Sequence, residues 1–217
     1  MDTDPDARVG LLTGAGKAFM AGADIKEYAR QSDAEFESFQ ALGRSLYLSL
    51  EANTKPVIAA VNGYAFGGGL EIALACDMMV AAEGVKMGLP EILLHLIPGG
   101  GGTQRLPRKL GLNRANELLM SGRTVTAEEM RDWGCVNHVF PREDFMTQAR
   151  AFAETFADKS PEALRVLKQL TQLVAGAFNP AAQALENEAL GRFYRSEAGQ
   201  SRIQDFYRKS LEKQKRS

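Results

Sequence analysis

The chain has 217 residues, 45% of them hydrophobic, and its 26 lysines and arginines nearly balance 27 aspartates and glutamates. A chain of this length and composition can bury a full hydrophobic core, and its balanced charge gives no indication of a nucleic-acid-binding surface. Two cysteines make no disulfide framework, and glycines, Asn62 and Glu71 interrupt the most apolar stretch, residues 56–75, so the sequence predicts neither a disulfide-rich secreted protein nor a membrane span.

The first predicted elements are a strand at residues 9–13, a run of small residues after it, and a long helix. Ser32 followed three residues later by Glu35 forms a capping box, which predicts that this helix begins near residue 33 and runs to about 51. Apolar residues recur along the helix at a spacing that places them on one face. These residues are Phe36, Phe39, Leu42, Leu46 and Leu50.

The next predicted elements bring glycines and acidic residues together. Residues 57–61 form a β-branched run typical of a buried strand, and three glycines at 67–69 open a helix that contains Glu71. The first N–H groups of a helix have no intrahelical partner, so this helix start combines an anion site with a carboxylate. A second carboxylate, Glu91, follows Gly88-Leu89-Pro90. The small residues after 9–13 could supply another N–H. Together with the N–H at the helix start, it would form an oxyanion hole, so the sequence predicts enolate or oxyanion chemistry.

The later segments predict two further strands, at 78–81 and 136–140, and a second capping box at Thr126 and Glu129. Gly134 is a plausible stop for the helix that this box begins. After Pro141 the pattern becomes entirely helical, with Ser160-Pro161-Glu162 as a clear helix start. The sequence therefore predicts an α/β core over residues 1–141 and a helical region over residues 142–217.

Several common cofactor sites are not supported by the residue pattern. A phosphate-binding loop at residues 11–18 would need a glycine at position 11 and a serine or threonine at position 18, where this chain has Leu11 and Ala18. His95 and His138 are the two histidines, and Cys76 lies far from Cys135 in sequence, so no metal site is predicted. We expect His95 to be a packing or interface residue and both cysteines to be buried thiols.

Five segments occur in a characteristic order: AGAD at 21–24, NGYAFGGGLE at 62–71, PE at 90–91, IPGGGGTQRL at 97–106 and GRTVTAEE at 122–129. In this order they resemble the crotonase (enoyl-CoA hydratase/isomerase) family, over nearly the whole chain from about residue 9. The resemblance implies an α/β fold built as a spiral of ββα units, followed by a C-terminal helical region that assembles trimers, often doubled to hexamers.

The resemblance also implies roles for individual residues. The backbone N–H groups of Ala23 and Gly68 would form the oxyanion hole, and the backbone at Gly99 would help to seat the reacting water. Glu71 would orient and deprotonate that water, while Glu91 would act as the acid/base group facing C2 of the substrate. Further contacts with CoA are implied at Ala21, Asp24, Ile25 and Lys26, and near the C-terminus at Phe206 and Lys209.

With both glutamates present, this chain resembles the hydratases of the family, which add water across the 2,3 double bond of a trans-2-enoyl-CoA. The implied substrate is an acyl-CoA thioester, with no cofactor or metal besides the CoA that the substrate carries. An isomerase of the same family is the alternative reaction. A catalytically weak structural subunit is a further alternative, because family members carry strands before Val9 where this chain has only an acidic leader. We therefore expect an exposed sheet edge at residues 9–13.

Each feature taken alone also has a plainer interpretation. The glycine runs could be tight turns that let backbone segments pack closely. Glu71 could be a first-turn glutamate favoured by the helix dipole, and Glu91 an ordinary loop acid. The C-terminal Phe206 to Lys209 could belong to a solvated basic tail. The first residues resemble neither a signal nor a transit peptide, so we expect a cytoplasmic protein without nucleic-acid or membrane partners.

Overall fold

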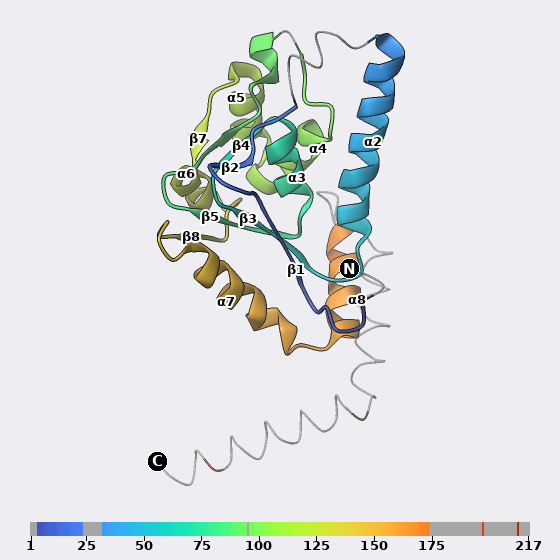
Figure 1. The fold of residues 1–217 in the computed structure, drawn as a ribbon, viewed down its shortest axis with the longest axis vertical. Helices are drawn as coiled ribbons and strands as arrows, with labels where there is room; N and C mark the ends of the chain where they lie inside the picture. The colour runs from blue at the N-terminus through green and yellow to red at the C-terminus, as the bar shows by residue number, and fades with distance from the viewer. Residues whose placement is uncertain (1–3, 24–31, 95, 174–196, 198–211, 213–217) are drawn as a thin grey trace. The chain divides into compact units, whose positions relative to one another are not determined.

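The computed structural model describes residues 4–23, 32–94, 96–173, 197 and 212 (Figure 1). The chain divides into two compact units, Met1–Pro161 and Glu162–Ser217. The first unit therefore extends beyond the predicted end of the core at 141 and includes a helix, α7 (Phe145–Ala157), which packs against the sheet strands. The trimerisation role expected for residues 142–217 stays a prediction.

A parallel four-stranded sheet forms the centre of the first unit. Its strands lie in the order β1 (Gly10–Thr13), β3 (Val57–Val61), β5 (Met78–Ala82) and β8 (His138–Phe140). These are the four predicted strands, although β1 begins at Gly10 and β8 at His138. In the described part of the chain β1 is an end strand of this sheet, as expected.

A second sheet is made of strands too short to be recognised in the sequence. Its order is β2 (Ala18–Met20), β4 (Tyr64–Phe66), β6 (Lys86–Gly88) and β7 (Val125–Thr126), with only the last strand antiparallel to its neighbour. The chain alternates between the sheets, since β1, β3 and β5 are each followed by a strand of the second sheet. This alternation is the predicted spiral of ββα units.

The helices after the strand pairs complete these units. Helix α2 (Asp33–Ala52) follows β2, and α3 (Gly68–Ala75) follows β4. After β6 come the 3-10 helix η1 (Pro90–Leu94), α4 (Gly102–Leu110) and α5 (Leu112–Ser121). The remaining helices besides α7 are α6 (Ala127–Asp132) and α8 (Pro161–Gln172), which begins at the predicted Ser160-Pro161-Glu162 start. No helix among the described residues combines the length and the apolar character needed to cross a bilayer.

The hydrophobic core lies around β3 and β5. Every residue of β3 is buried. A parallel strand that is covered on both faces has apolar residues throughout, which explains the continuous apolar run of this segment. Helix α7 packs against all four strands of the first sheet, while α3 packs against strands of both sheets (Figure 1). The structure thus holds α3, which carries Glu71, by buried contacts along its length.

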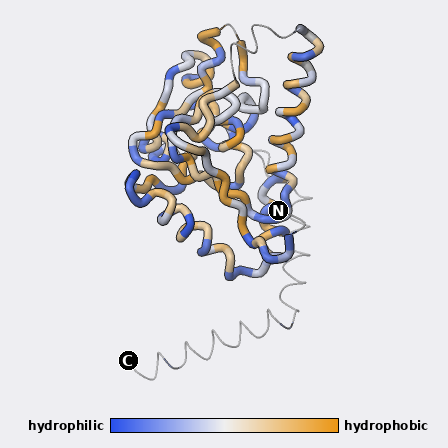
Figure 2. The backbone as a smooth tube through the Cα atoms, viewed as in Figure 1, coloured by the Kyte–Doolittle hydropathy of each residue, from blue (hydrophilic) through white to orange (hydrophobic). Residues whose placement is uncertain are grey.

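Both predicted capping boxes are present. The Ser32 N–H donates to Glu35 Oε2 at 2.8 Å. The Glu129 N–H donates to Thr126 Oγ1 at 3.2 Å, and the Thr126 N–H donates to Glu129 Oε2 at 3.0 Å. Gly134, with φ of +85°, follows the end of α6 as predicted. Along α2, apolar and polar residues alternate in a way that gives this helix one hydrophobic face (Figure 2).

Candidate active site

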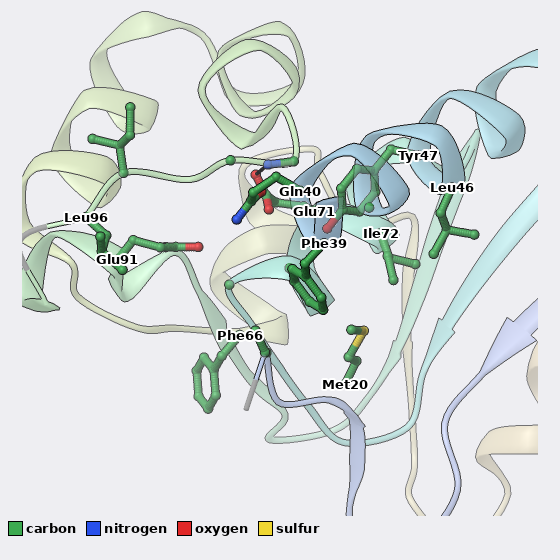
Figure 3. A pocket seen from close by; sticks show the side chains of 18 of the residues that line it. Met20, Phe39, Gln40, Leu46, Tyr47, Phe66, Glu71, Ile72, Glu91 and Leu96 are labelled. Carbon is green, nitrogen blue, oxygen red and sulfur yellow. Dashed lines mark hydrogen bonds between the residues drawn. The ribbon is translucent and has the colours of Figure 1, made fainter. Parts of the chain in front are cut away.

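One cavity in the first unit brings most of the predicted site residues together. It has a volume of about 620 Å³ and is lined by β2, α2, β4, α3, η1 and the loop that precedes α4 (Figure 3). The predicted residues that line it are Ala21, Ala23, Gly68, Glu71, Glu91 and Gly99. Asp24, Ile25, Lys26, Phe206 and Lys209 lie outside the residues that the structure describes, as does His95.

Glu71 lies at the buried end of this cavity, in the first turn of α3, with 3% of its surface exposed. Its Oε1 accepts hydrogen bonds from the N–H groups of Gly100 and Gly102, both at 2.8 Å. Burial raises the pKa of Glu71, while the two N–H donors and the nearby Arg105 charge lower it by less, so that the pKa remains above its ordinary value. The geometry therefore holds the carboxylate in one orientation while keeping it easy to protonate.

Glu91 is on η1, and its carboxyl group points into the same cavity (Figure 3). Its Oε2 is buried and has no hydrogen-bond partner among the described residues. Burial raises the pKa of Glu91, a hydrogen bond from its own backbone N–H lowers it by less, and the charge of Glu71 raises it further. Buried polar atoms are nearly always paired in native proteins, so this carboxyl oxygen is available to bind a ligand or a water molecule in the cavity.

Burial raises the pKa of both carboxyl groups, and the charge of Glu71 also raises the pKa of Glu91. Two such groups lose their protons as a coupled pair rather than independently. Glu71 has N–H donors and the Arg105 charge to stabilise its anion, whereas Glu91 has one carboxyl oxygen that no described residue binds. The anion of Glu71 is therefore better stabilised than the anion of Glu91.

The glycine loop before α4 fits closely around Glu71. A Cβ on Gly100 would lie 2.3 Å from the Tyr47 ring and 2.6 Å from Glu71 Oε2. A Cβ on Gly102 would lie 3.0 Å from Glu71 Oε1. Close backbone packing, the plainer interpretation of these glycines, is thus what gives the N–H groups access to the carboxylate. Gly99 lines the cavity, but the donors to Glu71 come from Gly100 and Gly102.

The two residues predicted to form the oxyanion hole, Ala23 and Gly68, both line the cavity. Gly68 is the first residue of α3, where a backbone N–H has no intrahelical acceptor. Ala23 follows β2 and lines the same cavity. Helix α3 has its N-terminus at this cavity, and the dipole of a helix favours negative charge there. Their role as an oxyanion hole stays a prediction.

Helix α2 supplies a wall of the cavity that the sequence reading did not assign to the site. Its face includes Phe36, Phe39 and Leu46, with Gln40 and Tyr47 at the matching helical positions. These residues recur at intervals of three, four and seven, so the same periodicity that predicts the apolar face could have found Tyr47. Leu42 also lines the cavity but stays 70% exposed. The predicted apolar face thus borders a cavity rather than closing entirely onto the core.

Arg105 is another residue that the sequence reading did not assign. It lies on α4 inside the IPGGGGTQRL segment, and its Nε and Nη2 donate to the two carboxylate oxygens of Glu51 at 2.7 and 2.8 Å. Its Nη1 donates to the carbonyl oxygen of Gly100. Arg105 therefore contacts the loop that holds Glu71 without itself lining the cavity.

Both cysteines are buried, as predicted. Burial raises the pKa of the Cys135 thiol to about 11, so this thiol stays protonated at neutral pH. His138 is on β8, where its ring stacks on Phe140 and meets Phe152 edge-on. In the described part of the chain, no three His, Cys, Asp or Glu side chains gather as a metal site would require.

The chain matches the enoyl-CoA hydratase/isomerase family model over residues 1–215. It is 45% identical over 169 residues to a probable enoyl-CoA hydratase of Mycobacterium bovis, a match that covers 78% of this chain and 65% of that protein. The chain thus spans less than two thirds of that relative's length. With the short-chain-enoyl-CoA hydratase of Clostridium acetobutylicum it shares 38% identity over 91% of this chain and 76% of that protein.

A solved structure agrees with the sequence comparison. The crystal structure of an enoyl-CoA hydratase from Bacillus anthracis superposes with a TM-score of 0.90 at 38% identity, covering 96% of this chain and 81% of that one. The fold, the order of the motifs and the relatives all agree. The chain belongs to the enoyl-CoA hydratase/isomerase family.

Proposed function

We propose that this protein is an enoyl-CoA hydratase, which adds water across the 2,3 double bond of a trans-2-enoyl-CoA thioester. The observation that carries this proposal is the pair of glutamates in one largely apolar cavity. Glu71 is held by two backbone N–H groups, and Glu91 has a carboxyl oxygen without a partner among the residues that the structure describes. Relatives named enoyl-CoA hydratase support it. An apolar cavity suits an acyl chain, because burying apolar surface stabilises the bound substrate.

In the proposed reaction, water attacks C3 while Glu71 accepts a proton from it. Negative charge then develops on the thioester carbonyl oxygen, where the N–H groups of Ala23 and Gly68 donate hydrogen bonds. Loss of one such donor typically lowers the rate on the order of 100- to 1000-fold. Glu91 donates its proton to C2, so the proton that water loses and the proton that C2 gains balance. The backbone N–H donors and the Arg105 charge that stabilise the anion of Glu71, together with the raised pKa of Glu91, support this division of roles.

The test is hydration of a short trans-2-enoyl-CoA by purified protein, followed by the loss of the conjugated thioester absorbance. Glu91→Gln and Glu71→Gln should each lower kcat by roughly 100- to 10,000-fold, which is the usual contribution of an acid/base group. Glu154→Gln, on the exposed surface of α7, is the matched control and should leave kcat unchanged. A folded wild-type protein without hydration at high enzyme concentration would favour the structural-subunit alternative.

The same variants separate hydration from isomerisation. Moving a double bond from position 3 to position 2 needs a group that shuttles one proton, and the unpaired oxygen of Glu91 is suited to that. In Glu71→Ala, hydration should be lost while any isomerisation of a 3-enoyl-CoA survives. If hydration persists undiminished in Glu71→Ala, the role proposed for Glu71 is wrong.

We also propose that the protein assembles as a homotrimer or a dimer of trimers, as the family resemblance implies. Light scattering coupled to size-exclusion chromatography gives the mass of the assembly directly. A mass equal to a single chain at micromolar concentration would contradict this assembly.

A further inference from the structure

The guanidinium group of Arg105 joins three parts of the proposed active site. Its Nε and Nη2 bind both oxygens of Glu51 on α2, in the two-pronged geometry that makes arginine–carboxylate pairs strong. Its Nη1 binds the Gly100 carbonyl, and its Cζ lies 5.7 Å from the centre of the Tyr47 ring. Only 12% of its side chain is exposed, so solvent screens these contacts weakly.

The loop that Arg105 contacts is the one that holds Glu71. Gly100 donates its N–H to Glu71 Oε1 and accepts from Arg105 through its carbonyl oxygen, so a single residue links the two side chains. The next residue, Gly101, has φ of +93° and precedes α4, whose Gly102 supplies the other N–H donor. The direction of both donors thus depends on how this short loop is held.

The wall of the cavity depends on the same contact. Glu51 is in the last turn of α2, the helix that lines the cavity with Phe39 and Tyr47. The Arg105–Glu51 pair connects this helix to α4, and the guanidinium group lies over the ring of Tyr47, which lines the cavity. Loss of the Arg105–Glu51 pair would therefore loosen both helix α2, which forms this wall of the cavity, and the glycine loop that holds Glu71.

We propose, on the basis of the hydration assigned above to Glu71, that Arg105 is a positioning residue that fixes the Gly100 and Gly102 N–H groups against Glu71 by binding Glu51 and the Gly100 carbonyl. Arg105 does not touch the substrate in this role. Its positive charge also favours the anionic form of Glu71, which lowers the pKa of that carboxyl and opposes the effect of burial. The charge of Glu71 in turn raises the pKa of Glu91, the other titratable group of the cavity.

Arg123 provides a matched control within the same chain. It also binds glutamates, Glu117 at 2.7 Å and Glu129 at 3.3 Å, and its guanidinium group lies 5.4 Å from the centre of an aromatic ring, that of Trp133. It does not line the cavity. A variant of Arg123 therefore removes the same kinds of contact without touching the glycine loop.

The experiment compares Arg105→Met, Arg105→Lys and Arg123→Met in the full chain. In Arg105→Met, kcat should fall on the order of 100-fold with little change in KM, because a displaced catalytic group slows chemistry more than binding. Lysine keeps the charge but not the planar fork, so Arg105→Lys should also lower kcat while leaving the pKa of Glu71 near its wild-type value. In Arg105→Met, that pKa should rise. Arg123→Met should leave kcat and this pKa unchanged.

Two measurements need no substrate, so they separate this proposal from the proposed hydration. Amide hydrogen exchange at Gly100 and Gly102 should become at least about tenfold faster in Arg105→Met, and carboxyl-carbon NMR follows the Glu71 titration. Absence of hydration in the wild type would overturn the proposed function alone. Wild-type exchange in Arg105→Met, or a loss of kcat no larger than in Arg123→Met, would overturn the positioning role. Should Arg105→Met not fold, Arg105→Lys and Glu51→Gln are judged by the same exchange and kcat criteria.

Discussion

At the scale of single residues, the main feature is a pair of carboxyl groups whose environment opposes ionisation. Burial raises the pKa of Glu71 and of Glu91. At Glu71 two backbone N–H donors and a nearby cation oppose this effect, and at Glu91 the residue's own backbone N–H opposes it. Such a site is costly for the folded state, because buried charge is unfavourable wherever it is not fully paired. Groups with such unfavourable environments are common in the active sites of proteins.

The raised pKa of Glu91 predicts how stability depends on pH. A carboxyl with a higher pKa in the folded than in the unfolded protein stabilises the fold below its ordinary value of 4.5, and this stabilisation is lost as pH rises through the folded value. Glu91→Gln removes the charge that forms at high pH. We expect its melting temperature to exceed that of the wild type at pH 8, and the difference to shrink towards pH 4.5 in calorimetric melts.

Glu128 is a control of opposite sign. Burial raises the pKa of Glu128, but hydrogen bonds, the strongest from the Gly84 N–H at 2.8 Å, outweigh this effect and lower it overall. Its stabilisation is therefore present at neutral pH and is lost as pH falls through the folded value. Glu128→Gln should melt below the wild type at pH 8. A Glu91→Gln variant that also melts lower at pH 8 would contradict the assignment of Glu91.

Two glycines that both face Tyr47 should respond oppositely to alanine. A Cβ on Gly100 would overlap the Tyr47 ring at 2.3 Å, whereas a Cβ on Gly43, inside α2, would meet the same ring at an ordinary 3.6 Å. Gly100→Ala should lower the free energy of unfolding by about 1 to 3 kcal/mol through overpacking. Gly43→Ala should raise it by up to about 1 kcal/mol, because alanine favours a helix over glycine. Urea denaturation measures both, and equal effects would contradict the packing described for the loop.

At the scale of elements, local signals decide where helices begin. The Ser32–Glu35 and Thr126–Glu129 boxes lie at the starts of α2 and α6 because each side chain pairs with backbone groups that the helix itself leaves unpaired. The apolar face of α2 is likewise a local pattern. Where that face lies, over a cavity with Leu42 exposed, depends on the neighbouring elements.

The cap of α6 has a measurable contribution. Thr126→Ala removes the acceptor of the Glu129 N–H and should lower the free energy of unfolding by about 1 kcal/mol. Thr155→Ala is the matched control, because Thr155 lies within α7 and its hydroxyl donates to the Phe152 carbonyl of the same helix. Its effect should stay within about 0.5 kcal/mol. Chemical denaturation of both variants checks the difference, and equal losses would show that the capping contact is not significant.

At the scale of the whole first unit, stability comes from the buried layer between α7 and α3. The central strands β3 and β5 contribute fully buried side chains, among them Ile58, Met79 and Val80. Each of these strands is followed by a turn that contains a glycine, and helix α3 packs against both strands. The layer that stabilises the fold therefore also positions α3 and Glu71.

A large-to-small substitution in this layer should be among the most destabilising. Ile58 is completely buried, and Ile58→Ala should lower the free energy of unfolding by about 2 to 5 kcal/mol through lost burial and the cavity left behind. Met120, on α5, is 73% exposed, and Met120→Ala should change it by no more than about 0.5 kcal/mol. Guanidinium denaturation measures both. Similar losses from the two variants would place the core elsewhere.

The sequence by itself determined the strands of the first sheet, both capping boxes and the glycine–glutamate segments, because each depends on neighbours within a few residues. The motif order was enough to indicate the family and to name Glu71 and Glu91. It did not reveal the second sheet, since strands as short as Ala18–Met20 carry too few residues for a period to be recognised.

Only the tertiary structure decided which groups meet at the site. Gly100 and Gly102 reach Glu71 from about thirty residues away in the chain, and Arg105 meets Glu51 across a still longer separation. The unpaired Oε2 of Glu91 is likewise visible only once the surrounding elements are in place. Such contacts depend on the packing of α2, α3 and α4 together, and no local pattern of residues encodes a distance between elements that are separated in the sequence.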